Sequence, residues 1–227
     1  MPLLTPPPLL GRRAALGAAL LGAAAGAAPP LSRVALARGP LLPTPAQTSG
    51  PFYPLDWEAG DADADLVRVT GTDARALGTV AHLRGRVLDA RTGSPVPGAV
   101  LEVWQCDARG VYRHPRDPRS ALGRDAGFQG RGRAVAGPDG AYAFRTIRPV
   151  AYPGRTPHIH LAAWRPGERG PALVTQVYVE GEPLNERDFL LRAIRDPRER
   201  EALMARFVPA DGVEPGALLA PFDVVLA

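Results

Sequence analysis

The sequence predicts an all-β protein, a sandwich of two antiparallel sheets with one or two short peripheral helices. Short runs of β-forming residues are separated by turn-forming Asp-Gly and Pro-Gly pairs, which are typical of antiparallel sheets. Within residues 141–146, Tyr142, Phe144 and Thr146 alternate with two alanines and an arginine, so one face of that segment is expected to be buried. The expected strands cover residues 83–88, 99–105, 140–147, 158–164, 173–179 and 222–226.

One helix is predicted close to the C-terminal end. Asp196 can act as its N-cap, Pro197 suits the first helical position, and Glu199 lies in the first turn. A shorter helix is expected over residues 186–194. The apolar stripe of the first helix is expected to comprise Leu203, Met204 and Phe207.

The N-terminal residues have the pattern of an export signal over residues 1–37. Arg12 and Arg13 precede an apolar run over 14–28, and the small residues of 35–37 form a cleavage site. The paired arginines indicate twin-arginine export to the periplasm, with the membrane contacted only in transit. If the signal is not cleaved, it would instead remain as a membrane anchor.

The rest of the chain is expected to form an N-terminal arm and acidic loop over residues 38–65 and one β-sandwich domain over 66–227. Without the signal the net charge is about +1, and no basic run is interleaved with aromatic residues, so nucleic-acid binding is not expected. The single cysteine, Cys106, lies in an apolar run and is predicted to be buried and inert.

A short segment combines several residues with metal-site chemistry. In a strand, residues two apart share a face at roughly 6–7 Å, so His158 and His160 can reach one metal ion. Tyr152 and Arg155 precede them in a Pro- and Gly-rich connection that can fold back toward the same point. The alternative is that the two histidines lie on the polar face of an exposed strand.

Four sequence groups together resemble the intradiol ring-cleavage dioxygenases, non-haem ferric enzymes that open catechols. They cover residues 48–54, 104–112, 146–160 and 175–178, and the resemblance extends over most of 48–226. It implies a prealbumin-like β-sandwich whose domain at 66–227 is catalytic. It also implies cleavage of a small aromatic diol between its two hydroxylated carbons, with O2, to a muconate-type diacid.

The same resemblance implies the roles of individual residues. Arg155 and Gln176 would act on the substrate, and Tyr152 would leave the metal when substrate binds. The segment Gly50-Pro51-Phe52-Tyr53 would line the pocket mouth, with Gly50, Pro51 and Tyr53 as candidate substrate-binding residues. The Fe(III) ligands would be Tyr112, Tyr152, His158 and His160.

Ligand chemistry supports this ferric assignment. Phenol side chains are normally protonated near pH 7, and only a strong Lewis acid such as Fe(III) would keep two of them ionised. Neutral imidazoles suit several transition metals. Tyr53, Tyr142 and Tyr178 are expected to be core or wall residues, and His82 and His114 to be surface or loop residues.

Three alternatives remain open. Residues 83–99 also resemble prealbumin-like sandwich modules of the cell envelope, which are non-enzymatic and lack the two tyrosines and two histidines. A cupin-type site would need a carboxylate and a third histidine at suitable downstream spacing, and no histidine follows His160. A zinc hydrolase does not call for two phenolates. The short segment before the sandwich favours protocatechuate-type architecture; the catechol that is cleaved and a possible homo-oligomeric state stay undetermined.

Overall fold

The computed structural model describes residues 40–55, 57 and 60–227. The predicted export signal over residues 1–37 lies outside these residues and stays a prediction. Within the described ranges, no helix is long and apolar enough to cross a membrane.

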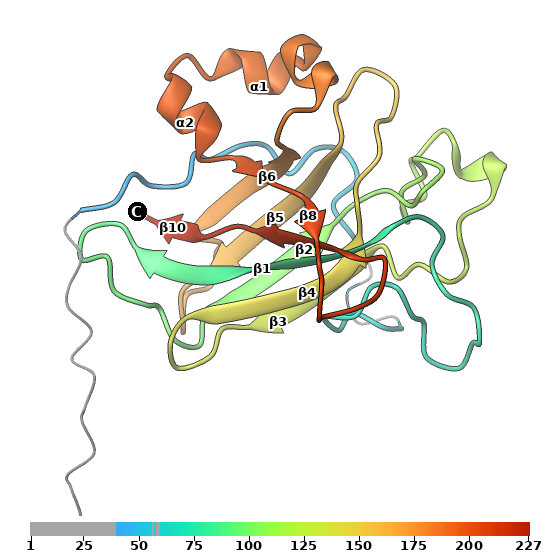
Figure 1. The fold of residues 1–227 in the computed structure, drawn as a ribbon, viewed down its shortest axis with the longest axis horizontal. Coiled ribbons are helices and arrows are strands. Elements are labelled where there is room, and N and C mark those ends of the chain that lie inside the picture. The colour runs from blue at the N-terminus through green and yellow to red at the C-terminus, as the bar shows by residue number, and fades with distance from the viewer. Residues whose placement is uncertain (1–39, 56, 58–59) are drawn as a thin grey trace, which may run out of the picture. The chain divides into compact units, whose positions relative to one another are not determined.

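Two five-stranded sheets pack face to face, as predicted (Figure 1). In the first, β1 pairs with β4 on one side and with β9 and β10 on the other, and β8 extends the sheet beyond β9. The second has the order β3-β2-β5-β6-β7. The first sheet consists of β1 (Val80–Asp89), β4 (Ala141–Ile147), β8 (Val208–Pro209), β9 (Leu218–Pro221) and β10 (Val224–Leu226). The second consists of β2 (Val100–Trp104), β3 (Arg131–Val135), β5 (His158–Trp164), β6 (Leu173–Val179) and β7 (Met204–Ala205).

Both sheets are mixed, whereas purely antiparallel sheets were expected. The pairs β1–β9, β1–β10 and β6–β7 are parallel. Strand β3 was not predicted: its sequence contains two arginines and a glycine, and it is held by antiparallel pairing with β2.

The alternation of residues in β4 determines which face of the first sheet packs against the core. Tyr142 and Phe144 are buried between the sheets, and the Tyr142 hydroxyl donates to the carbonyl of Phe222 at 2.6 Å. Gly85 lies opposite Tyr142 in the register. A Cβ at Gly85 would lie 1.7 Å from the Phe222 carbonyl oxygen. Only glycine therefore allows the backbone of Phe222 to pass this close to β1.

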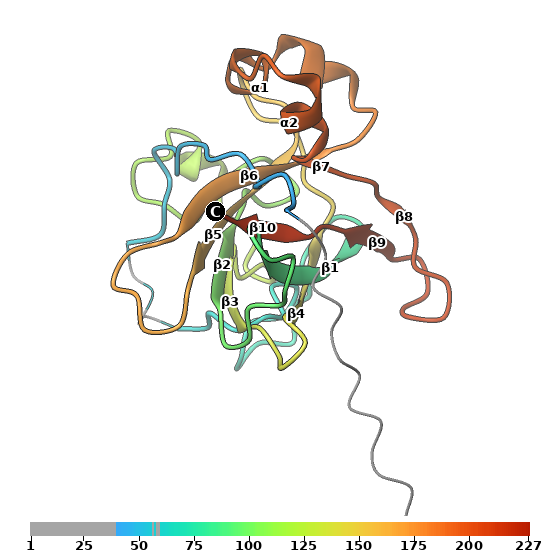
Figure 2. The same cartoon turned by 90° about the vertical axis from the view of Figure 1, so that its left-hand side faces the viewer.

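The helices are shorter than predicted. A 3-10 helix, η2 (Pro183–Arg187), is followed by α1 (Phe189–Ala193) and α2 (Pro197–Glu201), and α1 and α2 lie together beside β6 and β7 (Figure 2). A further 3-10 turn, η1 (Ser120–Leu122), lies between β2 and β3. Asp196 caps α2 as predicted, accepting from the amide of Arg198.

The predicted apolar stripe on the last helix is wrong, because α2 ends at Glu201. Met204 belongs to β7, where it pairs with Tyr178, and Phe207 packs against the sandwich core. Leu203 is fully buried against Tyr178 and Leu191 in a small separate cluster. Although these three apolar residues have helical spacing, one lies in a strand, one packs against the main core and one belongs to the small separate cluster.

The arm runs over the sandwich to the edge of the second sheet. The amide of Thr44 donates to the carbonyl of Val225 at 3.0 Å, and that of Gln47 donates to Val174 at 2.8 Å. The Thr175 hydroxyl donates to the carbonyl of Pro45 at 2.7 Å. These bonds bring residues 48–53 to the face of the second sheet that points away from the core.

Candidate metal centre

Strand β5 carries both predicted histidine ligands on one face. Ile159 and Leu161 point into the main core, so His158 and His160 point to the opposite side. Each imidazole is only 1% exposed because the arm and neighbouring loops cover this face. The alternative of an exposed strand is therefore wrong.

The sheet register brings further site residues to the same face. His160 lies between Trp104 of β2 and Gln176 of β6, and His158 lies opposite Tyr178. The His160 ring stacks on the Trp104 indole, with centroids 4.9 Å apart and an interplanar angle of 4°. Three adjacent strands thus supply the floor of one site.

The two imidazoles are neutral and face each other. Burial lowers the pKa of His158 to about 4 and, with the nearby His158, lowers the pKa of His160 well below its usual value. The Nδ1–H of His158 donates to the carbonyl of Thr156 at 2.7 Å, which leaves its Nε2 with a lone pair. The Nε2 atoms of the two histidines are 3.2 Å apart.

Tyr112 completes a convergent set of donor atoms. Its hydroxyl lies 3.5 Å from Nε2 of His158, and the residue is 2% exposed. Its amide donates to Asp117 Oδ2 at 2.6 Å, which holds the loop after β2 in place. Two imidazole nitrogens and a phenol oxygen therefore meet at one buried point, as a transition metal requires.

Tyr152 lies at the rim of this set. Its ring is edge-on to that of Tyr112, with the two centroids 5.5 Å apart. The centroid of the His158 ring is also 5.5 Å from that of Tyr152. Burial raises the pKa of both phenols, that of Tyr112 well above its usual value, although Arg155 opposes the shift. Both are neutral at pH 7 unless a strongly acidic cation binds, so this donor set fits a trivalent ion such as Fe(III).

The proposed ligand set depends on its tyrosines, because its two histidines are the only members of the commonest metal-binding residue types in it. No group of three or more His, Cys, Asp or Glu side chains that could hold a metal occurs in the described part of the chain. Nδ1 of His160 is buried without a hydrogen-bond partner.

Arg155 lies beside the donor set and is fixed by two strong bonds. Its Nε donates to Asp188 Oδ2 at 2.8 Å and its Nη2 donates to Gln176 Oε1 at 2.6 Å. Burial alone would lower its pKa, but the bond that it donates to Asp188 raises the pKa above the usual value, so Arg155 is a permanent cation. Gln176 in turn donates to the carbonyl of Thr48 in the arm at 3.1 Å.

Asp188 is a site residue that the sequence analysis missed. It accepts from Arg155, from the amide of Thr156 and from two amides at the start of α1. The sequence did contain a signal: Asp188 stands directly before the apolar Phe189-Leu190-Leu191, where an N-cap is expected.

The arm contributes to the site through its glycine and a phenylalanine. A Cβ at Gly50 would lie 3.2 Å from Cε1 of His160, so the backbone here approaches the imidazole closely. The Phe52 ring lies 4.9 Å from that of Tyr112 and 6.5 Å from that of Tyr152. Pro51 is exposed.

Tyr53 points away from the ligands. Its hydroxyl donates to Glu102 at 2.7 Å and its ring packs edge-on against Trp104. Burial and this bond raise the pKa of Tyr53 to about 12. The structure therefore brings Gly50 and Phe52 to the metal ligands and places Tyr53 behind Trp104.

Neither remaining histidine is a surface residue. His82 lies in β1, is buried, and its Nε2 is 3.1 Å from Glu214, so the expectation of a surface or loop residue is wrong. His114 lies in a loop as expected, but it is buried against Phe52. Cys106 is buried as predicted, and burial raises its thiol pKa to about 12.

Comparison with known proteins points to one group of enzymes. Residues 48–227 match the family described as Dioxygenase. The chain is 34% identical over 198 residues to the protocatechuate 3,4-dioxygenase beta chain of Burkholderia cepacia, covering 82% of each protein. It is 31% identical to hydroxyquinol 1,2-dioxygenase of Nocardioides simplex, covering 81% of this chain but 64% of that relative's length.

Solved structures agree with these relatives. The dioxygenase domain of a dioxygenase–carbohydrate-binding fusion from Streptomyces sp. SirexAA-E is 34% identical, with a TM-score of 0.60 over 82% of this chain and 98% of that one. Catechol 1,2-dioxygenase from Acinetobacter sp. ADP1 is 25% identical, with a TM-score of 0.60, and the match covers 81% of this chain and 62% of that one. The family match over residues 48–227 includes all the residues of the candidate site described above.

Proposed function

The chain belongs to the Dioxygenase family, as a ring-cleaving dioxygenase of the intradiol type, and we propose that it opens a catechol at a non-haem Fe(III) held by Tyr112, Tyr152, His158 and His160. The observation that carries this proposal is the buried meeting point of two neutral imidazole nitrogens and the Tyr112 oxygen. The family relation also argues against a non-enzymatic binding module.

The bound ferric ion would supply Lewis acidity that favours the deprotonated catechol and its reaction with O2. His158 and His160 present Nε2 lone pairs from a rigid strand, and the bond from His158 Nδ1 to Thr156 keeps its tautomer fixed. Tyr112 is the more deeply buried phenol and stays in place. Tyr152, at the rim, would hold the ion as a phenolate, and its oxygen is the base that would accept a substrate proton and so become a neutral phenol.

Arg155 and Gln176 act on the substrate side. The Arg155 cation is already oriented by Asp188 and Gln176, so it stabilises negative charge that develops on the ring oxygens without reorganising. The bond from Gln176 to Thr48 couples this pair to the arm. Both oxygen atoms of O2 enter the product, so a catechol becomes a muconate-type diacid with no other co-reactant.

Oxygen uptake by the iron-loaded protein tests the proposal. A panel of catechol, hydroxyquinol and 3,4-dihydroxybenzoate should show consumption of one O2 per ring, and an absorbance of the diacid product. Uptake without a muconate-type product, or no uptake with any member, would overturn it. Arg155→Gln should keep the iron content and lose most turnover.

Export and assembly are separate parts of the proposal. Arg12 and Arg13 would direct the chain through the twin-arginine route to the periplasm. Replacing both by lysine should leave the protein in the cytoplasmic fraction; unchanged export would contradict the route. A homo-oligomer, readable by light scattering, stays a prediction.

A further inference from the structure

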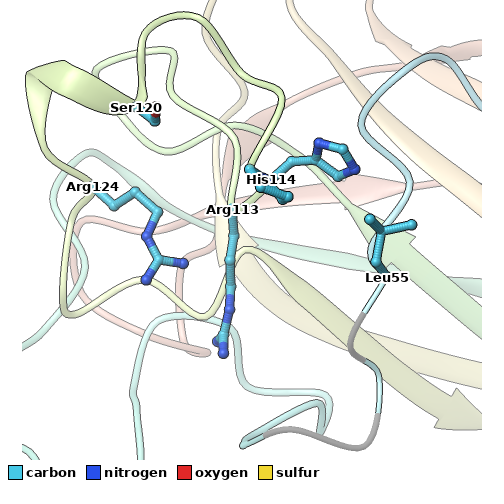
Figure 3. A pocket seen from close by; sticks show the side chains of 6 residues that line it. Leu55, Arg113, His114, Ser120 and Arg124 are labelled. Atoms are coloured by element: carbon cyan, nitrogen blue, oxygen red, sulfur yellow. The ribbon is translucent and has the colours of Figure 1, made fainter.

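A cavity of about 460 Å³ lies beside the proposed metal centre. This volume is within the range of roughly 300–1,000 Å³ found for small-molecule sites. No acidic side chain is among the described residues that line it. The lining residues are Leu55, Arg113, His114, Pro115, Ser120 and Arg124 (Figure 3).

Phe52 contacts both a proposed metal ligand and a residue that lines this cavity. None of the four proposed ligands lines the cavity. The centroid of the Phe52 ring lies 4.9 Å from that of Tyr112 and 5.7 Å from that of His114. The amide of His114 also donates to the carbonyl of Tyr112 at 2.8 Å. The cavity therefore neighbours the metal ligands through His114 and Phe52 but is not lined by them.

Arg124 is the principal charge in the cavity. The Arg113 guanidinium donates to the carbonyl of Gln129 at 3.5 Å and interacts with Asp61, so part of its charge is offset. No described carboxylate pairs with Arg124. Its neighbour Asp125 accepts from the amides of residues 77 and 127, and the nearby Asp117 carboxylate pairs with Arg119.

We propose that this cavity binds the carboxylate of a catechol that carries it on a side chain, with Arg124 as its main partner. A guanidinium matches a carboxylate in shape and charge, and the Ser120 hydroxyl adds a neutral donor. Leu55 lines the cavity and Phe52 packs against His114, so the two side chains are placed for apolar contact with the intervening chain. Because none of the four proposed ligands lines the cavity, a carboxylate on a side chain of two or three carbons is better suited to reach it than one attached directly to the ring.

This inference rests on the proposed function, and its test compares an acid with its neutral ester. Oxygen uptake is measured with 3-(3,4-dihydroxyphenyl)propanoate and its methyl ester. The native protein should favour the acid. Arg124→Gln should lower the acid-to-ester ratio of kcat/KM at least about tenfold, mainly through KM, as the loss of one charge-assisted hydrogen bond predicts. Arg124→Glu should lower it further.

Two controls sharpen the test. Arg91→Gln removes an exposed arginine from the turn after β1 and should keep the ratio. With 3,4-dihydroxybenzoate, Arg124→Gln should lower kcat/KM less than it does with the propanoate, because the benzoate carries its carboxylate directly on the ring. An unchanged acid-to-ester ratio in Arg124→Gln overturns the subsite, and an equal effect on the benzoate overturns its assignment to side-chain acids.

Failure of the proposed function is recognised separately. If the native protein consumes no O2 with any catechol, the cavity can still be tested. Calorimetry then measures the binding of 3-(3,4-dihydroxyphenyl)propanoate to the iron-free protein. Binding about tenfold weaker in Arg124→Gln than in the native protein supports the carboxylate site. Equal binding overturns it.

Discussion

Replacing Asp188 with alanine is expected to destabilise the protein by about 3–5 kcal/mol, the cost of breaking a buried ion pair. The Asp188 side chain is fully buried and that of Arg155 is 7% exposed. The carboxylate accepts four hydrogen bonds at 2.8–3.1 Å, from Arg155 Nε and from the amides of Thr156, Leu190 and Leu191. The substitution leaves the Arg155 guanidinium buried without its counter-charge.

The loss of the α1 N-cap alone would cost about 0.5–2 kcal/mol. This cost is not simply added to that of the ion pair, because the same carboxylate serves both. Urea unfolding followed by circular dichroism measures the total. Turnover should fall as well, since Arg155 would lose the bond that orients it.

Asp196→Ala is the matched control. Asp196 caps α2, which is as long as α1, and also pairs with an arginine, but its Arg198 partner is 78% exposed. This substitution should destabilise much less, because water and salt screen the exposed pair. Equal effects of Asp188→Ala and Asp196→Ala would refute the argument from burial.

The effect of Asp188 should depend on pH. Burial would raise its pKa, but the bonds from Arg155 and the backbone amides lower the pKa below the usual 3.8. A depressed carboxylate pKa stabilises the fold above the unfolded-state pKa, and this stabilisation is lost as pH falls through the folded-state value. The difference between native protein and Asp188→Ala should therefore shrink below about pH 3.8.

Three further predictions concern Gly50 in the arm, the ion pair of Arg145 with Glu214, and the thiol of Cys106. Gly50→Ala adds a Cβ 3.2 Å from His160 at a backbone φ of 69°; the strain of about 1–2 kcal/mol should lift the arm and raise KM, and an unchanged KM would contradict the close approach. The bond from Arg145 lowers the pKa of Glu214 to about 2, so the melting-temperature difference between native protein and Glu214→Gln should be full above pH 4.5 and shrink toward pH 2; a constant difference would be contrary to this. Cys106 should resist thiol reagents at pH 8 until the protein is unfolded, and rapid labelling of the native protein would show that it is not buried.

Much of the sandwich could be predicted from local patterns. The inward alternation of Tyr142 and Phe144 is a property of one strand and was correctly read. Strand β3 could not be read, because Arg131 and Arg133 are held by contacts with other segments: Arg133 pairs with Glu102 on the neighbouring strand. The parallel pairs of β9 and β10 with β1 join segments more than 130 residues apart, and no local pattern encodes such pairing.

The site was predictable to a similar extent. The spacing of His158 and His160 fixes their common face once the strand is known. The position of Tyr112 came from resemblance, because a loop tyrosine has no periodic signature. Asp188 was missed because its N-cap signal is local, while its pairing with Arg155 joins residues 33 positions apart in the chain.

The visible spectrum of the iron-loaded protein tests the central claim most directly. Tyrosinate bound to Fe(III) should give a broad visible charge-transfer band and a red colour. Tyr112→Phe should shift or weaken that band. Tyr142→Phe removes an equally buried phenol that bonds to Phe222 in the core, and it should leave the band intact. A colourless protein that contains one iron per chain, or an unchanged band in Tyr112→Phe, would contradict the proposed metal centre.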